Sequence, residues 1–176
     1  VGSPVIQFLY TLRDLQKPLV MSVNGVAVGI GVTMLLHADF VVAAEDAKFQ
    51  LPFINLALCP EGGSSLLLAQ RAGYLRAAEK LMFGDFFSAK EALDMQVVSH
   101  VLPHHETLRY AVHQAHRLAE KSPAALRETK RLLKVTNADA LRKALDVEIA
   151  SFAEMLKGDD AREAMTAFLE KRKPIF

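Results

Sequence analysis

The sequence is poor in cysteine and contains no tryptophan. Cys59 is the single cysteine among 176 residues, so no disulfide can form within the chain. This cysteine usage is typical of proteins from a reducing compartment, and we therefore expect a cytoplasmic location.

Net charge and long apolar runs are also scarce. The 21 Lys and Arg residues are almost balanced by 20 Asp and Glu residues, which leaves a formal net charge of +1. This balance, without a strongly basic stretch, argues against nucleic acid as a partner. No apolar run reaches the roughly 18 residues typical of a membrane-spanning helix, so we expect no membrane partner either.

The chain does contain enough apolar residues for a core, since 51% of its residues are hydrophobic and 23% are charged. An apolar run at 19–23, closed by Asn24-Gly25, predicts a buried strand, and Phe40–Ala44 predicts another. Between them, a glycine turn leads into an apolar run that predicts a helix. Strand, turn, helix and strand form a βαβ unit, so we predict an α/β fold that binds its ligand beyond the carboxyl ends of the strands.

Helix signals dominate the second half of the chain. Ser88-Ala89-Lys90-Glu91 is a capping box that predicts a helix over 89–95, and the run 97–102 predicts a last strand, ended by Pro103. From residue 104 onward only helical stripes occur, with Ser122-Pro123 and Asp160-x-x-Glu163 as predicted starts. We therefore divide the chain into an α/β part at 1–103 and a helical part at 104–176.

The turn Gly29-Ile30-Gly31 is a first candidate site. It does not match the dinucleotide-binding fingerprint, because Met34 stands where a third glycine is needed, and no phosphate-loop Gly-Lys-Ser/Thr follows it. The free N–H groups of a helix start can instead stabilise an oxyanion. Spacing alone equally allows a plain strand-to-helix turn.

Glu61 is the most informative single residue. It stands between Pro60 and Gly62-Gly63, at the predicted start of a helix and among apolar neighbours. Apolar surroundings raise the pKa of a carboxyl group and a helix amino terminus lowers it, so Glu61 is a candidate general base. The alternative is a carboxylate that only stabilises the helix dipole.

The remaining polar and aromatic residues predict no further site. His113 and His116 lie three apart on a predicted helix, but no cysteine or His-Glu-x-x-His partner lies nearby, so we expect a solvated face and no metal. Phe49 and Phe53 can either line an acyl pocket or fill the core. Cys59 is expected to be a small buried side chain rather than a nucleophile.

Together, these motifs resemble a known superfamily over nearly the whole chain. The pattern from Lys17-Pro18 through Asn24-Gly25-x-Ala27-x-Gly29-x-Gly31 is similar to that of the crotonase (enoyl-CoA hydratase/isomerase) superfamily. The match continues, in register, through these segments: Ala38-Asp39, Pro60-x-Gly62-Gly63-Ser64, Ser88-Ala89-Lys90-Glu91-Ala92 and Met165–Arg172.

The resemblance implies a fold, a substrate class and an assembly. The fold is a partial spiral of ββα turns followed by a carboxyl-terminal helical trimerisation region, and the chain is expected to form homotrimers or hexamers. The partner is an acyl-CoA thioester, so coenzyme A belongs to the substrate and no separate cofactor is expected. The family holds the thioester oxygen between two backbone N–H groups, and the resemblance assigns one of them to Ile30.

Two departures from the family pattern narrow the reaction. Hydratases carry a glutamate at each of two positions that are Thr33 and Phe53 here. Hydration needs a base for the water and an acid for the α-carbon, which argues against a hydratase. The sequence instead resembles the peroxisomal-type Δ3,Δ2-enoyl-CoA isomerases, whose single catalytic glutamate corresponds to Glu61.

The isomerase resemblance assigns further roles. The residues expected to bind the substrate are Ala27, Gly29, Phe53, Leu56 and Leu58. Of these, Phe53, Leu56 and Leu58 are expected to keep water from it. The apolar stripe of the residues Leu141, Leu145, Ile149 and Phe152 is expected to form trimer contacts.

Two alternatives remain open. Members of the family have roughly 80–90 residues before the first predicted helix, so we expect that an amino-terminal portion of the family fold, which supplies the other oxyanion donor, is missing. Such a chain can also be a non-catalytic acyl-CoA-binding module. Another reaction of the superfamily, such as thioester hydrolysis, is the second alternative.

Overall fold

Six short strands form two three-stranded sheets in the computed structural model of the chain, which describes residues 3–176. The first sheet has the order β1-β3-β6 and is parallel throughout. The second has the order β2-β4-β5, with β2 parallel and β5 antiparallel to β4. The strands are β1 Val20–Val23, β2 Val26–Val28, β3 Phe40–Ala44, β4 Lys48–Gln50, β5 Phe86–Ser88 and β6 His100–Leu102.

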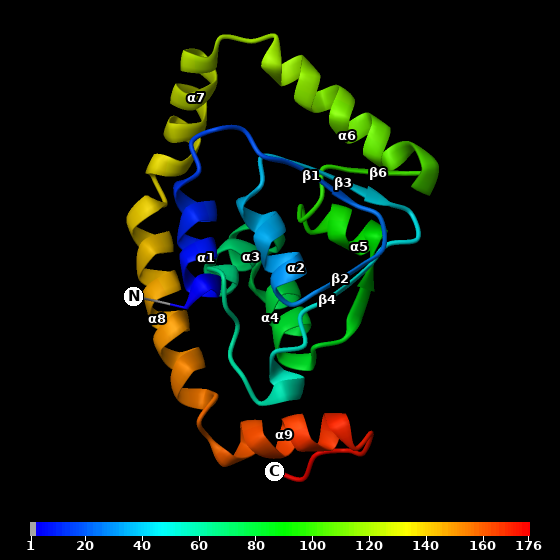
Figure 1. Cartoon of the computed structure of the whole chain (residues 1–176), viewed down its shortest axis with the longest axis vertical. Coiled ribbons are helices and arrows are strands. Elements are labelled where there is room, and N and C mark those ends of the chain that lie inside the picture. Colours follow the sequence, from blue (N-terminus) through cyan, green and yellow to red (C-terminus); the bar gives the residue numbers. More distant parts are fainter. Residues whose placement is uncertain (1–2) are drawn as a thin grey trace.

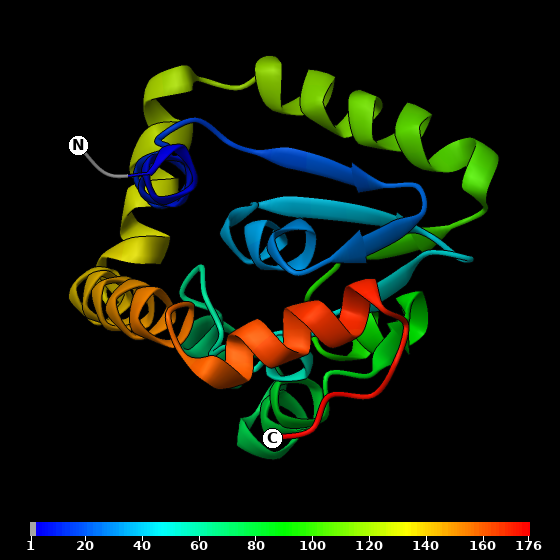
Figure 2. The ribbon, with the colours of Figure 1, turned by 60° about the horizontal axis from the view of Figure 1, so that its bottom comes forward.

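The chain passes twice from the first sheet to the second. It turns after β1 into β2, returns through a short helical segment to β3, and turns again into β4 (Figure 2). Val20 pairs with Phe40 in the first sheet, and Val26 pairs with Lys48 in the second. Each step is therefore a ββα unit stacked on the previous one, and the predicted α/β class is confirmed.

Helices surround the two sheets. Helix α6 lies across β1 and β3, α7 and α8 run along one side next to α1, and α9 crosses the end opposite α6 (Figure 1). The α-helices are α1 Pro4–Asp14, α2 Ile30–Thr33, α3 Ser64–Ala72, α4 Tyr74–Phe83, α5 Ala89–Asp94, α6 His104–Ala119, α7 Pro123–Val135, α8 Ala138–Met155 and α9 Asp159–Leu169. The 3-10 helices are η1 Met34–His37 and η2 Ile54–Leu56.

The main core lies between the sheets and the helices. Phe49 on β4 is fully buried and stacks on Phe87 of β5, with ring centroids 5.5 Å apart. Phe49 is therefore a core residue, the second of the two roles that its sequence allowed. A smaller cluster joins Leu9 of α1 to Leu141 and Leu145 of α8.

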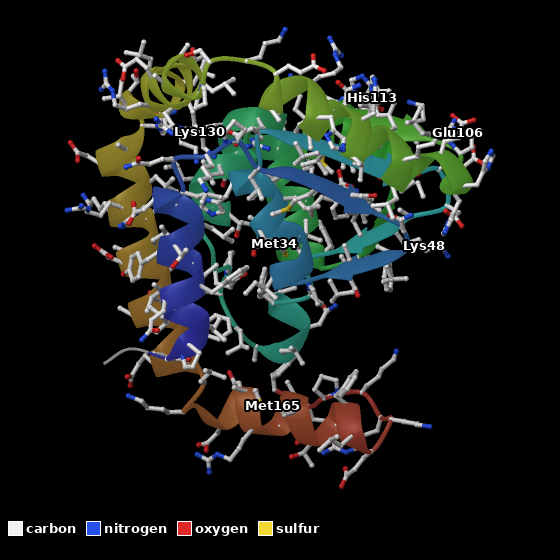
Figure 3. All side chains as sticks on the ribbon, turned by 45° about the horizontal axis from the view of Figure 1, so that its top comes forward. Met34, Lys48, Glu106, His113, Lys130 and Met165 are labelled. Atoms are coloured by element: carbon white, nitrogen blue, oxygen red, sulfur yellow. The ribbon has the colours of Figure 1, made fainter. Side chains whose placement is uncertain are left out.

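Helix α7 is joined to the start of β3 by a partly buried ion pair. Lys130 reaches from α7 toward the segment that joins α1 to β1 (Figure 3). Its ammonium donates to Asp39 Oδ2 at 2.6 Å and to the Lys17 carbonyl at 2.7 Å. Asp39 also accepts from the Leu19 amide at 2.7 Å, so the Ala38-Asp39 motif fixes the start of β3 and the seat of α7.

Local signals predicted several boundaries well. Helix α3 starts at Ser64, directly after the Glu61 turn as predicted, and the Ser88 capping box is present. At α7 the Ser122 hydroxyl accepts from the Ala125 amide at 3.4 Å, and proline occupies the first turn.

Other boundaries differ from the prediction. The last strand begins at His100 rather than Val97, and the short strands β2 and β5 were not predicted. Helix α9 begins at Asp159 after Gly158, so Asp160 lies inside the first turn and does not cap it. Short strands are hard to predict because pairing with a distant neighbour, rather than local pattern, creates them.

The apolar stripe of α8 is buried in its first half and half-buried at Ile149 and Phe152. Leu141 and Leu145 are buried against α1, and Phe152 packs edge-on against Phe53 with ring centroids 6.5 Å apart. The trimer contacts expected on this stripe stay a prediction. The trimer or hexamer itself stays a prediction, as does the domain division at 103/104.

Within residues 3–176, no helix combines the length and the apolarity that crossing a bilayer requires.

His113 lies on the exposed face of α6, turned away from the sheet (Figure 3). The described part of the chain holds no cluster of three or more His, Cys, Asp or Glu side chains that can bind a metal ion.

Candidate active site

The turn that carries Glu61 is held between helices α2 and α8. Gly62 and Gly63 have φ angles of +71° and +75°, a backbone region that favours glycine. A Cβ atom at Gly62 would lie 2.9 Å from Thr33, and one at Gly63 would lie 2.6 Å from Leu141 Cδ1. The two glycines therefore allow both the bend and the close approach of the neighbouring helices.

The carboxyl group of Glu61 is buried, and one side of it is free. The residue is 8% exposed, and its Oε1 accepts a hydrogen bond from the Thr33 hydroxyl at 2.5 Å. Among the described residues, Oε2 has no hydrogen-bond partner. A buried acceptor without a partner is costly, which makes this oxygen a candidate contact for a ligand.

The surroundings of Glu61 change its affinity for a proton. Burial is the main cause of a raised pKa for Glu61, and the charge of Glu148 raises this pKa further. The hydrogen bond from Thr33 acts in the opposite direction. The sequence predicted the effect of burial, and a pKa raised toward neutrality suits a group that takes up and returns a proton.

Glu61 faces an apolar cavity of about 520 Å³. Its walls come from the first half of α1, the second half of α8 and the start of α2. The lining residues are Ser3, Val5, Ile6, Leu9, Ile30, Phe53, Glu61, Ile149, Phe152, Ala153 and Leu156. Glu61 is the single carboxylate among these residues, and no cation accompanies it.

Ile30 begins α2 at the wall of the same cavity. Gly29 precedes it with φ +56°, and the Gly29 carbonyl accepts from the amides of Val32 and Thr33. The N–H groups of Ile30 and Gly31 come before these donors, in the first turn, where a helix provides no backbone acceptor. The amide of Ile30 therefore has no acceptor within α2, and its predicted hydrogen bond to a thioester oxygen stays a prediction.

Three of the seven residues predicted for the site line this cavity, namely Ile30, Phe53 and Glu61. The other four are not among its lining residues. Ala27 of β2 and Leu58 are buried in the core, Leu56 packs against that core from η2, and Gly29 forms the bend before α2. Their predicted contact with the substrate stays a prediction.

Three residues of the site were not predicted. Thr33 had been recognised only as a departure from the family pattern, yet it holds Glu61. His37 is buried and its Nε2 lies 2.7 Å from the Gly62 carbonyl, while burial lowers its pKa. Glu148 contacts the same turn from α8. For Glu148 no local signal exists, because 85 residues separate it from Gly63.

The comparisons with known proteins agree on one family. A family model described as enoyl-CoA hydratase/isomerase matches residues 1–176. The 2,3-dehydroadipyl-CoA hydratase of Escherichia coli K12 is 36% identical over 165 residues, and the match covers 94% of the chain and 65% of that relative. A probable enoyl-CoA hydratase of Bacillus subtilis 168 is 34% identical, with 97% and 66% covered. The chain thus spans about two thirds of the length of these curated relatives.

The fold has a similar neighbour among solved structures. The enoyl-CoA hydratase/isomerase of Pseudoalteromonas atlantica T6c superimposes with a TM-score of 0.96 at 36% identity. The match covers 100% of the chain and 71% of that structure. The predicted crotonase-like fold, with helices at the carboxyl end, is therefore confirmed.

Proposed function

The chain belongs to the enoyl-CoA hydratase/isomerase family, and we propose that it shifts the double bond of a 3-enoyl-CoA to the 2-position. One observation carries the proposal. Glu61 is the single carboxylate among the lining residues of an apolar cavity, and its Oε2 is free of protein partners in the described residues. A double-bond shift needs one group that removes a proton and returns it.

The proposed reaction uses Glu61 twice. Its carboxylate removes a proton from C2 of the acyl chain, and the electron pair delocalises onto the thioester oxygen. The N–H group of Ile30 donates a hydrogen bond to that oxygen and stabilises the charge. The protonated Glu61 then delivers the same proton to C4 as the double bond moves, so no other reactant is consumed.

The environment of Glu61 favours proton return over the addition of water. Hydration needs a second acid or base, but Thr33 is fully buried and bound to Glu61, and Phe53 adds an aromatic wall. An apolar wall excludes water from the intermediate. The raised pKa of Glu61 also brings its acid and base forms closer in energy, as a proton carrier requires.

The cavity suggests an apolar acyl group as the substrate. Apart from Glu61 its lining is almost entirely aliphatic or aromatic, and it offers no cation to a second carboxylate on the acyl chain. Each methylene that leaves water for such a wall contributes about 0.8 kcal/mol. We therefore expect an unsubstituted acyl chain to bind more tightly than a dicarboxylic one.

Hydration of a 2-enoyl-CoA is the second candidate, because both curated relatives above are named hydratases. The same assay distinguishes the two reactions. Isomerisation converts a 3-enoyl-CoA to a 2-enoyl-CoA, while hydration converts the 2-enoyl-CoA to a 3-hydroxyacyl-CoA. Release of free coenzyme A would instead indicate thioester hydrolysis.

Glu61→Gln tests the proposal in the protein at its natural length. We expect the rate of 3-enoyl-CoA isomerisation to fall by about 10²–10⁴-fold, the usual contribution of a general base. The matched control is Glu154→Gln on α8. The Glu154 side chain is 78% exposed, forms an ion pair with Lys157 and is not among the lining residues of the cavity. An unchanged isomerase rate in Glu61→Gln would exclude the mechanism, and binding of acyl-CoA without any turnover would favour a non-catalytic module.

A further inference from the structure

Glu148 is a second buried glutamate beside the active-site turn, and the proposed reaction does not use it. It lies in the middle of α8 and is 6% exposed. Its carboxylate accepts from the Gly63 amide at 2.5 Å, from the Ser65 amide at 2.9 Å and from the Ser65 hydroxyl at 2.5 Å. Glu148 thus binds donors on both sides of the point where the turn becomes α3.

These contacts match the chemistry of a helix start. The first N–H groups of α3 have no acceptor within the helix, and the helix dipole places partial positive charge there. A carboxylate satisfies both requirements, but here it comes from another helix. Hydrogen bonds to charged groups are stronger than those between neutral groups. The position of the turn therefore depends on where α8 packs.

The turn is also fixed on its other sides. The Thr33 hydroxyl holds the Glu61 carboxyl group, His37 contacts the Gly62 carbonyl, and the Ser64 hydroxyl donates to the Glu61 carbonyl at 2.6 Å. Glu148 is the contact of this set that reaches the turn from the carboxyl-terminal helices. With the Glu148 contact, the turn is held from several sides. Its two glycines would otherwise give this backbone more conformational freedom than other residues.

We propose that Glu148 is a positioning residue, which orients Glu61 against the acyl chain by fixing the Gly63–Ser65 backbone to helix α8. The proposal rests on the proposed function, in which Glu61 carries the proton. Ile149, the next residue of α8, lines the cavity together with Phe152 and Ala153. The Glu148 side chain therefore fixes the position of Glu61, the base, relative to the α8 wall of the acyl site.

Misalignment is expected to affect the chemical step more than binding. A displacement of about 1 Å between a base and its substrate can cost 10²-fold in rate, whereas the apolar wall still binds the acyl chain. Removal of the Glu148 charge should therefore lower kcat and leave KM almost unchanged.

Glu148 also acts on Glu61 through its charge. The groups that face Glu61 are Thr33 from α2, His37 through the Gly62 carbonyl, and Glu148 from α8, while the lining residues of α1 are uncharged. Cys59 lies two residues before Glu61 on the same segment. The charge of Glu148 raises the pKa of Glu61. Loss of the Glu148 charge should therefore move the acid limb of the pH–rate profile to lower pH.

The experiment compares Glu148→Gln with Glu148→Asp in the protein at its natural length. We expect Glu148→Gln to lower kcat by about 10–100-fold, to change KM by less than about twofold and to move the acid limb to lower pH. Glu148→Asp keeps the charge, so it should keep the limb in place and recover part of the rate. Glu154→Gln, on the same helix, should match the wild type.

Ser65→Ala is a milder variant for the case in which Glu148→Gln does not fold. It removes one of the donors to Glu148 and leaves both backbone amides in place. We expect kcat to fall by about three- to tenfold. The effect is smaller than in Glu148→Gln because only one of the three hydrogen bonds to the carboxylate is lost. A wild-type kcat in Ser65→Ala would then overturn the proposal.

Two other outcomes would also overturn it. The first is a Glu148→Gln variant with wild-type kcat and pH profile. The second is a loss of rate with an unmoved acid limb and no recovery in Glu148→Asp, which would indicate only a structural role. Failure of the proposed function looks different, because then the wild type itself shows no isomerisation, or Glu61→Gln retains it.

Discussion

Helices α3 and α5 are stabilised at their amino termini in different ways. At α5 the cap is local, because the Ser88 hydroxyl accepts from the Glu91 amide at 3.2 Å and Glu91 accepts from the Ser88 amide at 2.8 Å. At α3 the first residues have no such partner nearby, and the carboxylate of Glu148 reaches them from α8. One helix start is therefore complete in itself, and the other depends on the docking of a distant helix.

The difference follows from what each helix does. The cap of α5 is exposed, and its Glu91 also forms an ion pair with Lys80 of α4. The start of α3 is buried and carries the turn with Glu61, so its geometry is set by the elements that form the cavity. This contrast predicts how strongly each site responds to mutation.

The largest effect is expected for Glu148→Ala. The substitution leaves two amides without their acceptor, that of Gly63 in a buried position and that of Ser65 in a partly buried one. We expect the free energy of unfolding to fall by roughly 2–3 kcal/mol, as for the loss of hydrogen bonds to a charged group. Urea unfolding measures the change, and Glu154→Ala on the same helix should stay within about 0.5 kcal/mol of the wild type. A loss below about 1 kcal/mol in Glu148→Ala, the effect of one ordinary hydrogen bond, would show that α3 does not depend on Glu148.

Gly63→Ala should have the next largest effect. The new Cβ would lie 2.6 Å from Leu141 Cδ1, within the small core cluster that joins α1 to α8. Overpacking of a core, together with the positive φ angle, predicts a loss of about 2 kcal/mol. Gly84→Ala is the comparison, since Gly84 has φ +67° but its Cβ would meet only the end of the Asn55 side chain. Equal losses in the two variants would mean that backbone strain alone, and not the seat of α8, determines the result.

Glu61→Gln should change stability in the opposite direction. A raised folded-state pKa means that the folded protein holds the Glu61 proton more tightly than the unfolded chain does. The stability that this proton supplies is complete below the ordinary value of 4.5 and is lost as pH rises through the folded pKa. At pH 7 we expect the glutamine variant to be more stable by about 1 kcal/mol, and below pH of about 4 the difference should vanish. Unfolding at several pH values checks this, and a difference that is independent of pH would contradict it.

Ser88→Ala should have the smallest effect, about 0.5–1 kcal/mol, because the cap is exposed. The backbone hydrogen bond from Ser88 is the main cause that lowers the pKa of Glu91 to about 2, and Lys80 contributes. The cap therefore stabilises α5 above pH 4.5 and loses its effect as pH falls toward 2. Thermal unfolding of Ser88→Ala and of Ser151→Ala, an exposed helix position, separates the cap from the general cost of losing a hydroxyl. Equal melting temperatures in the two variants would show that the cap adds nothing.

The sequence predicted those features of the site that depend on neighbouring residues. It identified Glu61 as a carboxylate at a helix start among apolar side chains, and the turn before α2. Gly62 and Gly63 signalled the bend between Pro60 and α3. It did not predict that Thr33 holds Glu61, because Thr33 lies 28 residues away in the chain and had been considered only as a missing acid.

By itself the sequence determined the α/β class, the starts of α3, α5 and α7, and the candidate base, because capping residues, glycine turns and apolar periodicity act over a few residues. Only the tertiary structure decided which side of Glu61 is free, which walls enclose it, and that Glu148 holds its turn. It also showed that Leu141 and Leu145, in the first half of the α8 stripe, pack against α1. The physical reason is that hydrogen bonds and packing between distant segments depend on how helices dock, and docking leaves no local pattern in the chain.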